Sequence, residues 1–82
     1  MDLQVLRCFC AVAAEGSLSG AAQRLHYAQS NLSTRISQLE REVGSPLFYR
    51  NNRGVTLTPK GELLLKYATN LLHLAEPVDW RD

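Results

Sequence analysis

A stretch in the middle of the chain is dense in short polar side chains that could recognise nucleic acid. In a helix expected from about residue 30 to 43, the side opposite the apolar positions carries Ser30, Thr34, Ser37, Gln38 and Arg41. Asn31 and Ser33 lie on the flanks of this side, and Gln29 comes just before the helix. Hydroxyl and amide groups donate and accept hydrogen bonds, so they can pair with base edges and phosphates without filling a DNA groove. A solubilising face would normally be dominated by lysine and glutamate, which favours recognition, although a merely polar surface is the alternative.

Three of these positions offer defined contacts to bases. A glutamine amide can pair with an adenine edge through both its oxygen and its nitrogen, and Gln29 could do so from the start of the helix. Ser33 or Thr34 could reach a base edge or a thymine methyl group. A helix with this face could enter a major groove as a recognition helix.

Two arginines flank a predicted turn and could form a second contact surface. Arg50 and Arg53 lie on either side of Asn51 and Asn52. A guanidinium on a protruding hairpin fits a narrow minor groove or a phosphate, and Arg53 lies nearer the tip. Arginines in a turn can also be simply solvated, and it is their position beside a recognition helix that favours DNA contact.

Catalytic and metal chemistry has little support in the sequence. His26 and His73 have no ligand-like spacing with each other or with Cys8 and Cys10. Residues two apart on a helix point about 200° apart, so the two cysteines are expected to be reduced rather than disulfide-bonded. The serines lack a base and an orienting partner, and no glycine-rich phosphate loop occurs. We therefore expect no enzyme, no metal and no cofactor.

Size and composition indicate one small globular domain. The chain has 82 residues, of which 45% are hydrophobic and 21% charged, with a net charge of +1. Between residues 24 and 60, six basic side chains face two acidic ones, which suits a surface that contacts phosphates, or equally a solvated charged face. Charged residues interrupt every apolar run, so no membrane span is expected, and no export signal is visible at the N-terminus. A cytoplasmic location is the expectation.

Helical spacing of apolar residues predicts three helices in the first half of the chain. Residues 2–14 form the first, which Gly16 ends as a left-handed cap. Ser17 caps a second, shorter helix, and Ser30 caps a third that ends at Gly44. The expected inward positions are Leu3, Leu6, Phe9, Cys10, Val12, Ala13, Leu18, Ala21, Ala22, Leu25, Leu32, Ile36, Leu39 and Val43. The second and third helices, joined by a short turn and packed on the first, make a helix-turn-helix.

The second half of the chain predicts a hairpin and a last helix. Strand-prone runs at 48–50 and 55–57 flank turn residues 51–54, which indicates a β-hairpin. Thr58 and Pro59 then supply a cap and a first helical residue. This last helix is apolar nearly all round, so one side can pack on the domain while the other needs a partner.

The expected fold is mainly α, a winged helix-turn-helix with a three-helix core, a two-stranded β-hairpin wing and a long C-terminal helix. Residues 1–58 form the DNA-binding domain and residues 59–76 the linker and dimerisation helix. Residues 77–82, with the lone Trp80, form a tail after the helix.

A set of residues along nearly the whole chain matches a known family pattern. They are Leu3, Leu6, Phe9, Val12, Ala13, Glu15, Gly16, Ser17, Leu18, Ala21, Ala22, Gln23, Arg24, Leu25, His26, Gln29, Ser30, Asn31, Leu32, Ser33, Ile36, Leu39, Glu40, Gly44, Pro46, Leu47, Phe48, Arg50, Leu57, Thr58, Pro59, Gly61 and Glu62. Over about residues 2–75, the sequence resembles the N-terminal winged helix-turn-helix of LysR-type bacterial transcriptional regulators. The resemblance is specific because many positions match in one order and register.

The resemblance implies a homodimer joined through the last helix, bound to a partly palindromic operator with its recognition helices in successive major grooves. The family's base-reading positions fall on Gln29, Ser30, Ser33 and Thr34, and its wing contacts on the arginines of the turn. Two positions differ from the family pattern: Ser30 stands where proline is frequent, and Thr34 where arginine is frequent. The preferred base sequence is therefore expected to be particular to this chain.

Two sets of site residues are expected. The DNA contacts are Gln29, Ser30, Asn31, Ser33, Thr34, Arg35, Gln38, Arg50, Arg53 and Thr58. The dimer contacts are Leu64, Tyr67, Ala68, Leu71, Leu74 and Ala75. Family members usually continue into a larger effector-binding domain, and no small-molecule effector site is expected in this sequence. A winged helix used only for protein association, through its last helix, is the alternative function.

Overall fold

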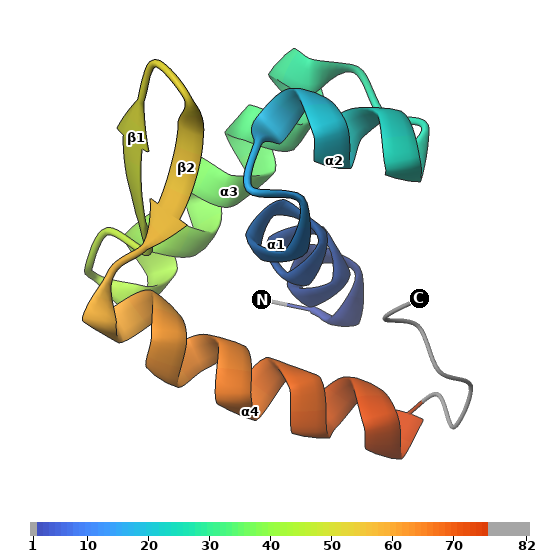
Figure 1. Cartoon of the computed structure of the whole chain (residues 1–82). Coiled ribbons are helices and arrows are strands. Elements are labelled where there is room, and N and C mark those ends of the chain that lie inside the picture. The colour runs from blue at the N-terminus through green and yellow to red at the C-terminus, as the bar shows by residue number, and fades with distance from the viewer. Residues whose placement is uncertain (1, 76–82) are drawn as a thin grey trace.

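The computed structural model describes residues 2–75, and the predicted tail with Trp80 lies outside the described residues. The described elements follow one another as α1 (Leu3–Glu15), α2 (Leu18–Leu25), α3 (Gln29–Val43), β1 (Phe48–Asn51), β2 (Gly54–Leu57) and α4 (Pro59–Ala75). Helix α1 lies at the centre, with α2 and α3 on one side and α4 on the other (Figure 1). The predicted winged helix-turn-helix architecture is confirmed.

Local capping sets the bounds of α1 and α2. The caps at Gly16 and Ser17 were predicted from the sequence, whereas the cap at Asp2 was not, and α1 runs from Leu3 to Glu15 rather than over residues 2–14. The Asp2 carboxylate accepts a hydrogen bond from the Val5 amide at 2.9 Å, and α1 ends at Gly16 in the left-handed conformation, with φ 71°. The Ser17 hydroxyl accepts from the Gly20 amide at 2.9 Å and so caps α2. Leu3 was expected on the buried side, but it is 40% exposed because it stands in the first turn of α1.

Helix α3 begins earlier than predicted. Its N-cap is Ala28, in an extended conformation with no side-chain cap, so Ser30 is a residue of the first turn and not the cap. The backbone of α2 decides this start, because His26 takes a left-handed φ of 62° and the Tyr27 amide donates to the Ala22 carbonyl at 2.9 Å. The chain turns within two residues and enters α3 at once. Gln29 is therefore the first residue of the helix.

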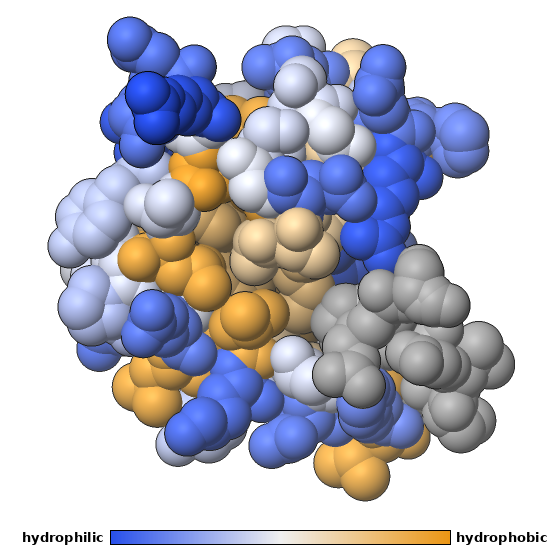
Figure 2. Space-filling model, in the orientation of Figure 1, coloured by the Kyte–Doolittle hydropathy of each residue, from blue (hydrophilic) through white to orange (hydrophobic). Residues whose placement is uncertain are grey.

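The wing is an antiparallel pair in which Phe48 faces Leu57 and Asn51 faces Gly54. Asn52 and Arg53 form its two-residue connection, as the turn residues predicted. Figure 2 shows the hydrophilic tip of this hairpin at the upper left. The hairpin therefore projects polar and basic groups away from the core.

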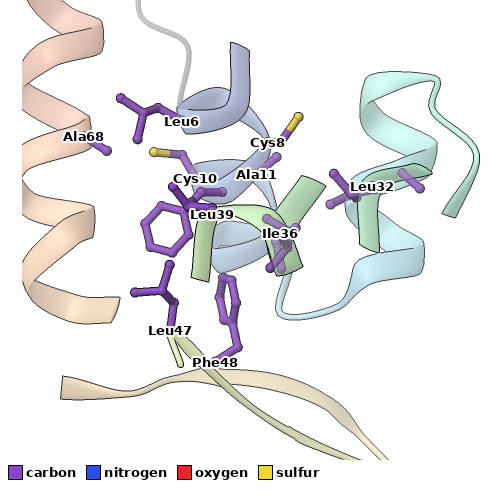
Figure 3. Packing of buried hydrophobic residues seen from close by; sticks show 14 of the residues in the cluster. Leu6, Cys8, Cys10, Ala11, Leu32, Ile36, Leu39, Leu47, Phe48 and Ala68 are labelled. Atoms are coloured by element: carbon purple, nitrogen blue, oxygen red, sulfur yellow. The ribbon is translucent and has the colours of Figure 1, made fainter. Parts of the chain in front are cut away.

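The core joins α1 to every other layer of the fold. The Phe9 and Phe48 rings, from α1 and β1, lie 5.3 Å apart between centroids. Figure 3 shows Ala68 pointing from α4 toward α1. The buried apolar residues are Leu6, Cys8, Phe9, Cys10, Ala11, Val12, Ala21, Ala22, Leu32, Ile36, Leu39, Leu47, Phe48, Ala68 and Leu72. Within residues 2–75, no helix is both long and apolar enough to cross a membrane.

Burial gives the two free cysteines a testable signature. It raises the pKa of the Cys8 thiol, and it raises that of Cys10 from 9.0 to about 11. Because the unfolded chain loses this proton first, the stabilisation that the Cys10 thiol provides is complete below pH 9.0 and declines as the pH rises toward 11. At pH 8, Cys10→Ala should lower the free energy of unfolding by about 1 kcal/mol or more.

Denaturant unfolding of both proteins from pH 8 to 11 tests this expectation. The difference in unfolding free energy between the original chain and Cys10→Ala should shrink as the pH rises, since the other titrating groups are common to both. A difference that stays constant over this range would mean that Cys10 is no better shielded from water in the folded state than in the unfolded state.

Candidate nucleic-acid interface

The polar face of α3 points away from the core. On the inner side, Leu32, Ile36 and Leu39 are fully buried. On the outer side, the exposed residues are Gln29, Ser30, Asn31, Thr34 and Gln38, and the half-buried ones are Ser33 and Arg35. The structure thus brings the predicted base-reading side chains onto one surface, while their contact with DNA stays a prediction.

A hollow beside the start of α3 adds polar residues that sequence reasoning missed. It is lined by Ser17, Ser19, Gly20, Ala22, Gln23, Tyr27 and Gln29. Ser19 and Gln23 are exposed on α2 and carry the same hydroxyl and amide chemistry as α3. Their spacing of four residues places them on one side of α2, which is the signal that could have found them.

Arg35 is held in place by two neighbours. Its Nε donates a hydrogen bond to Asn31 Oδ1 at 3.3 Å, one helical turn earlier. Its guanidinium carbon lies 5.3 Å from the centre of the Tyr27 ring, which is within cation–π range. Tyr27 belongs to the turn between α2 and α3, and no sequence pattern singles it out as a site residue.

The wing is fastened to the helix-turn-helix by its backbone. The Val55 amide of β2 donates to the Gly16 carbonyl at 2.9 Å, in the connection between α1 and α2. At the tip, Asn51 Oδ1 accepts from the Arg53 amide at 2.8 Å, which shapes the turn. Arg50 and Arg53 are both exposed, as predicted. Two arginines therefore stand at a fixed position relative to α2 and α3.

Glu40 ties α3 to the start of the wing. One oxygen of its carboxylate, Oε2, accepts from the amide of Leu47 at 2.8 Å and from that of Phe48 at 3.3 Å. This contact sets the position of β1 relative to α3.

Thr58 has a structural role that differs from the expected one. It is 6% exposed, and its hydroxyl donates to the Pro46 carbonyl at 2.8 Å while accepting from the Gly61 amide at 3.0 Å. Both hydrogen-bonding directions of the hydroxyl are used inside the domain. We therefore exclude Thr58 from the proposed DNA contacts, because it caps α4 and anchors the loop before β1.

The outer side of α4 carries an apolar stripe, which we call the α4 stripe. It consists of Leu63, Tyr67, Leu71 and Leu74, which are 48%, 58%, 49% and 84% exposed. Spacings of four, four and three residues put them on one side of the helix. Figure 2 shows hydrophobic surface over this helix along the lower edge of the molecule.

The α4 stripe differs in part from the predicted dimer contacts. Ala68 is fully buried in the core of its own chain, and Leu64 packs partly against that core. Helix α4 packs on the core through the side that carries these two residues. Because Ala68 is already covered by its own chain, we exclude it from the proposed dimer surface. Leu63 was missed. Ala75 is the last residue of α4, and its side chain lies outside what the structure describes.

The part of the chain that the structure describes contains no cluster of three or more His, Cys, Asp or Glu side chains that could hold a metal ion. What it contains is a helix-turn-helix with a polar outer face and an arginine-bearing wing. The class that these features define is the winged helix-turn-helix module.

Comparison with known proteins identifies the family. The profile of bacterial regulatory helix-turn-helix proteins of the lysR family matches residues 3–62. The chain belongs to this family, which is one of regulators and not of enzymes.

Similar full-length regulators are known from bacilli. The chain is 49% identical over 76 residues to the HTH-type transcriptional regulator GltR of Bacillus subtilis, covering 93% of this chain and 26% of GltR. It is 59% identical over 74 residues to the regulator YofA of Bacillus velezensis, covering 90% of this chain and 26% of YofA. The chain therefore spans about a quarter of the length of these curated relatives.

Similar solved structures include DNA complexes. The chain matches the DNA-binding domain of CbnR in complex with DNA, with a TM-score of 0.88 at 37% identity, covering 92% of this chain and 86% of that one. It matches the domain of BenM on benA site 1 DNA with a TM-score of 0.89 at 42% identity, covering 94% and 86%.

Proposed function

We propose that this chain binds double-stranded DNA with sequence preference, with α3 in the major groove and the wing at the minor groove or the phosphates. The outward face of α3 carries this proposal. It is uncharged at its N-terminal end and offers amide and hydroxyl groups, while arginines at the wing supply the positive charge. The similar domains of CbnR and BenM were solved in complex with DNA, which supports DNA binding by this chain.

Particular side chains have particular roles in this proposal. Gln29 and Ser33 are the base-reading residues, with Ser30 and Gln38 beside them. The Thr34 hydroxyl donates to the Ser30 carbonyl at 3.0 Å, so Thr34 presents its methyl group or an oxygen lone pair to DNA. Arg50 and Arg53 neutralise phosphates or enter a narrow minor groove.

The α4 stripe supports assembly as a homodimer. Four large apolar side chains on one exposed helix face are what a second copy of the helix would cover. A two-fold dimer would place its two recognition helices on half-sites about 34 Å apart or a multiple of that. Regulation of bacterial transcription, in the cytoplasm where the DNA lies, would follow from such binding.

Selection from a pool of random duplexes, with sequencing at two salt concentrations, tests the proposal. Enrichment of a two-fold symmetric motif is the expected result, with a salt slope of about one unit for each phosphate contact. Salt-dependent binding without any enriched motif would contradict sequence preference. Absence of binding to every duplex would favour the alternative, a module for protein association only.

Replacing both Gln29 and Ser33 by alanine should remove base reading and leave the fold intact. We expect the affinity for the selected duplex to fall about 30-fold or more, because each of the two base contacts contributes about 1–3 kcal/mol. Binding to unrelated duplexes should change little, since the wing arginines remain. Ser45→Ala, in the loop after α3, is the control and should bind as the original chain does. Equal losses on selected and unrelated duplexes would show that these two side chains do not read bases.

A further inference from the structure

The amide of Asn31 on α3 has a fixed orientation. Its oxygen accepts the hydrogen bond from Arg35 Nε at 3.3 Å. A guanidinium has donors only, so the amide must turn its oxygen toward Arg35 and its NH₂ group away from it. Asn31 is exposed on the outer surface of the recognition helix. The NH₂ group therefore points away from Arg35 toward an approaching ligand, while one of the two acceptor positions of the oxygen is already occupied.

The partner that fixes Asn31 is itself held on its other side. The guanidinium of Arg35 lies against the Tyr27 ring, 5.3 Å from its centre. The Tyr27 hydroxyl in turn accepts a hydrogen bond from the Gln4 side-chain amide of α1. Arg35 is half-buried and contacts both the Tyr27 ring and Asn31, so its side chain is restricted before any ligand arrives. The arrangement connects the first helix, the turn and the recognition helix.

We infer that Arg35, held by Tyr27, makes Asn31 a donor-only reader of base edges; this inference rests on the proposed DNA binding. An asparagine that pairs with adenine uses its oxygen and its nitrogen together. In this chain Arg35 Nε already occupies one of the two lone pairs of the oxygen, which makes the oxygen the weaker acceptor for a base and favours contacts through the NH₂ group. Guanine N7 and O6, or thymine O4, are acceptors and match the N–H groups, whereas adenine places its N6–H₂ donor beside its single acceptor, N7, and would set donor against donor. The base that Asn31 contacts should thus be guanine or thymine, and adenine should be disfavoured.

Phosphate oxygens are acceptors too, and two variants separate them from base edges. Asn31→Ala removes the donors and should change the enriched base at one position of each half-site. Asn31→Asp keeps an acceptor for Arg35 but removes the donors, and should weaken binding to the preferred duplex about tenfold or more. If Asn31→Ala lowers the affinity for all duplexes equally, the amide contacts a phosphate and the inference is wrong.

Arg35→Met is the decisive variant. Methionine replaces the apolar, unbranched stem of the arginine side chain but lacks the guanidinium donors that orient the Asn31 amide. Asn31 is then free to turn and pair with adenine. At the base pair identified by Asn31→Ala, the affinity for an adenine-bearing duplex relative to the preferred one should rise about tenfold. The same shift, in smaller measure, is expected of Tyr27→Leu, which removes the cation–π contact. Tyr27→Phe keeps the ring and is the matched control, with base preference unchanged.

Two results would overturn the inference while leaving the proposed function in place. One is a wild-type motif that already has adenine at the Asn31 position. The other is a uniform loss of affinity in Arg35→Met with the salt slope lower by about one, which would make Arg35 a direct phosphate contact. A wild-type chain that enriches no motif would instead contradict the proposed function itself, and the inference with it.

Discussion

Leu71→Asp is expected to be monomeric in solution and to bind a duplex with two half-sites about 100-fold more weakly than the original chain. Leu71 lies in the α4 stripe and is 49% exposed, so the aspartate can remain solvated in the monomer. In a dimer that covers the stripe, its carboxylate would be buried without a partner. Loss of the second subunit also removes the effective concentration that links two binding events, which is worth about two to four powers of ten.

Sedimentation equilibrium and duplex titrations check both parts of this expectation. Binding to a duplex with one half-site should change little, because the α3 face is untouched. His73→Asp is the matched control: it adds one negative charge to the same helix, on an exposed position about 200° around from Leu71. If Leu71→Asp keeps the original mass and affinity, the α4 stripe is not the dimer surface. If His73→Asp acts equally, charge rather than the stripe is responsible.

The position of the α4 stripe could be predicted only in part from the sequence. The last helix is apolar nearly all round, so its periodicity does not show which side docks on α1. The predicted dimer face therefore combined exposed residues, such as Leu71 and Leu74, with Ala68, which the core covers completely. A small residue at a close helix crossing is typical of a core position, and only the contact with α1 reveals that crossing here.

Most helix and strand bounds were predictable because local signals determine them. A serine cap at Ser17 and left-handed glycines at Gly16 and Gly44 end or begin helices through contacts within a few residues. The start of α3 was wrong for the opposite reason. It depends on the left-handed His26, a conformation that sequence patterns assign to glycine far more often than to histidine. Ser30 therefore looked like a cap although the helix had already begun.

The candidate DNA-binding face was predictable from helical period, but the contacts that shape it were not. Period alone separates the outer polar residues of α3 from the buried ones. The contact between Glu40 and the amides of β1 joins residues seven and eight apart across a loop. The Tyr27 ring meets Arg35 only because the turn folds back over α3. Such contacts depend on tertiary geometry and side-chain rotamers, which composition and spacing do not specify.

Gly54→Ala should strongly destabilise the domain, with the free energy of unfolding lower by about 3 kcal/mol or more. Gly54 has φ 132°, a conformation that costs other residues on the order of 1–3 kcal/mol. A Cβ there would also overlap the carbonyl oxygen of Gly16, which accepts the Val55 amide. The backbone can relieve this overlap only by giving up that hydrogen bond, worth about 1 kcal/mol. For a domain of this size, the melting temperature should fall by roughly 12 °C or more.

Gly16→Ala is the control that isolates the overlap from conformational strain. Gly16 also has a left-handed φ of 71°, but a Cβ there would meet no other atom within 4 Å. Its replacement should therefore cost only the left-handed penalty of about 1–2 kcal/mol. Below the melting temperature, Gly54→Ala should also bind DNA more weakly than Gly16→Ala, because moving β2 displaces Arg53. Equal melting temperatures for the two variants would mean that the contact between the wing and Gly16 does not stabilise the domain. The conclusion that this contact holds the wing arginines at a fixed position beside α2 and α3 would then be wrong.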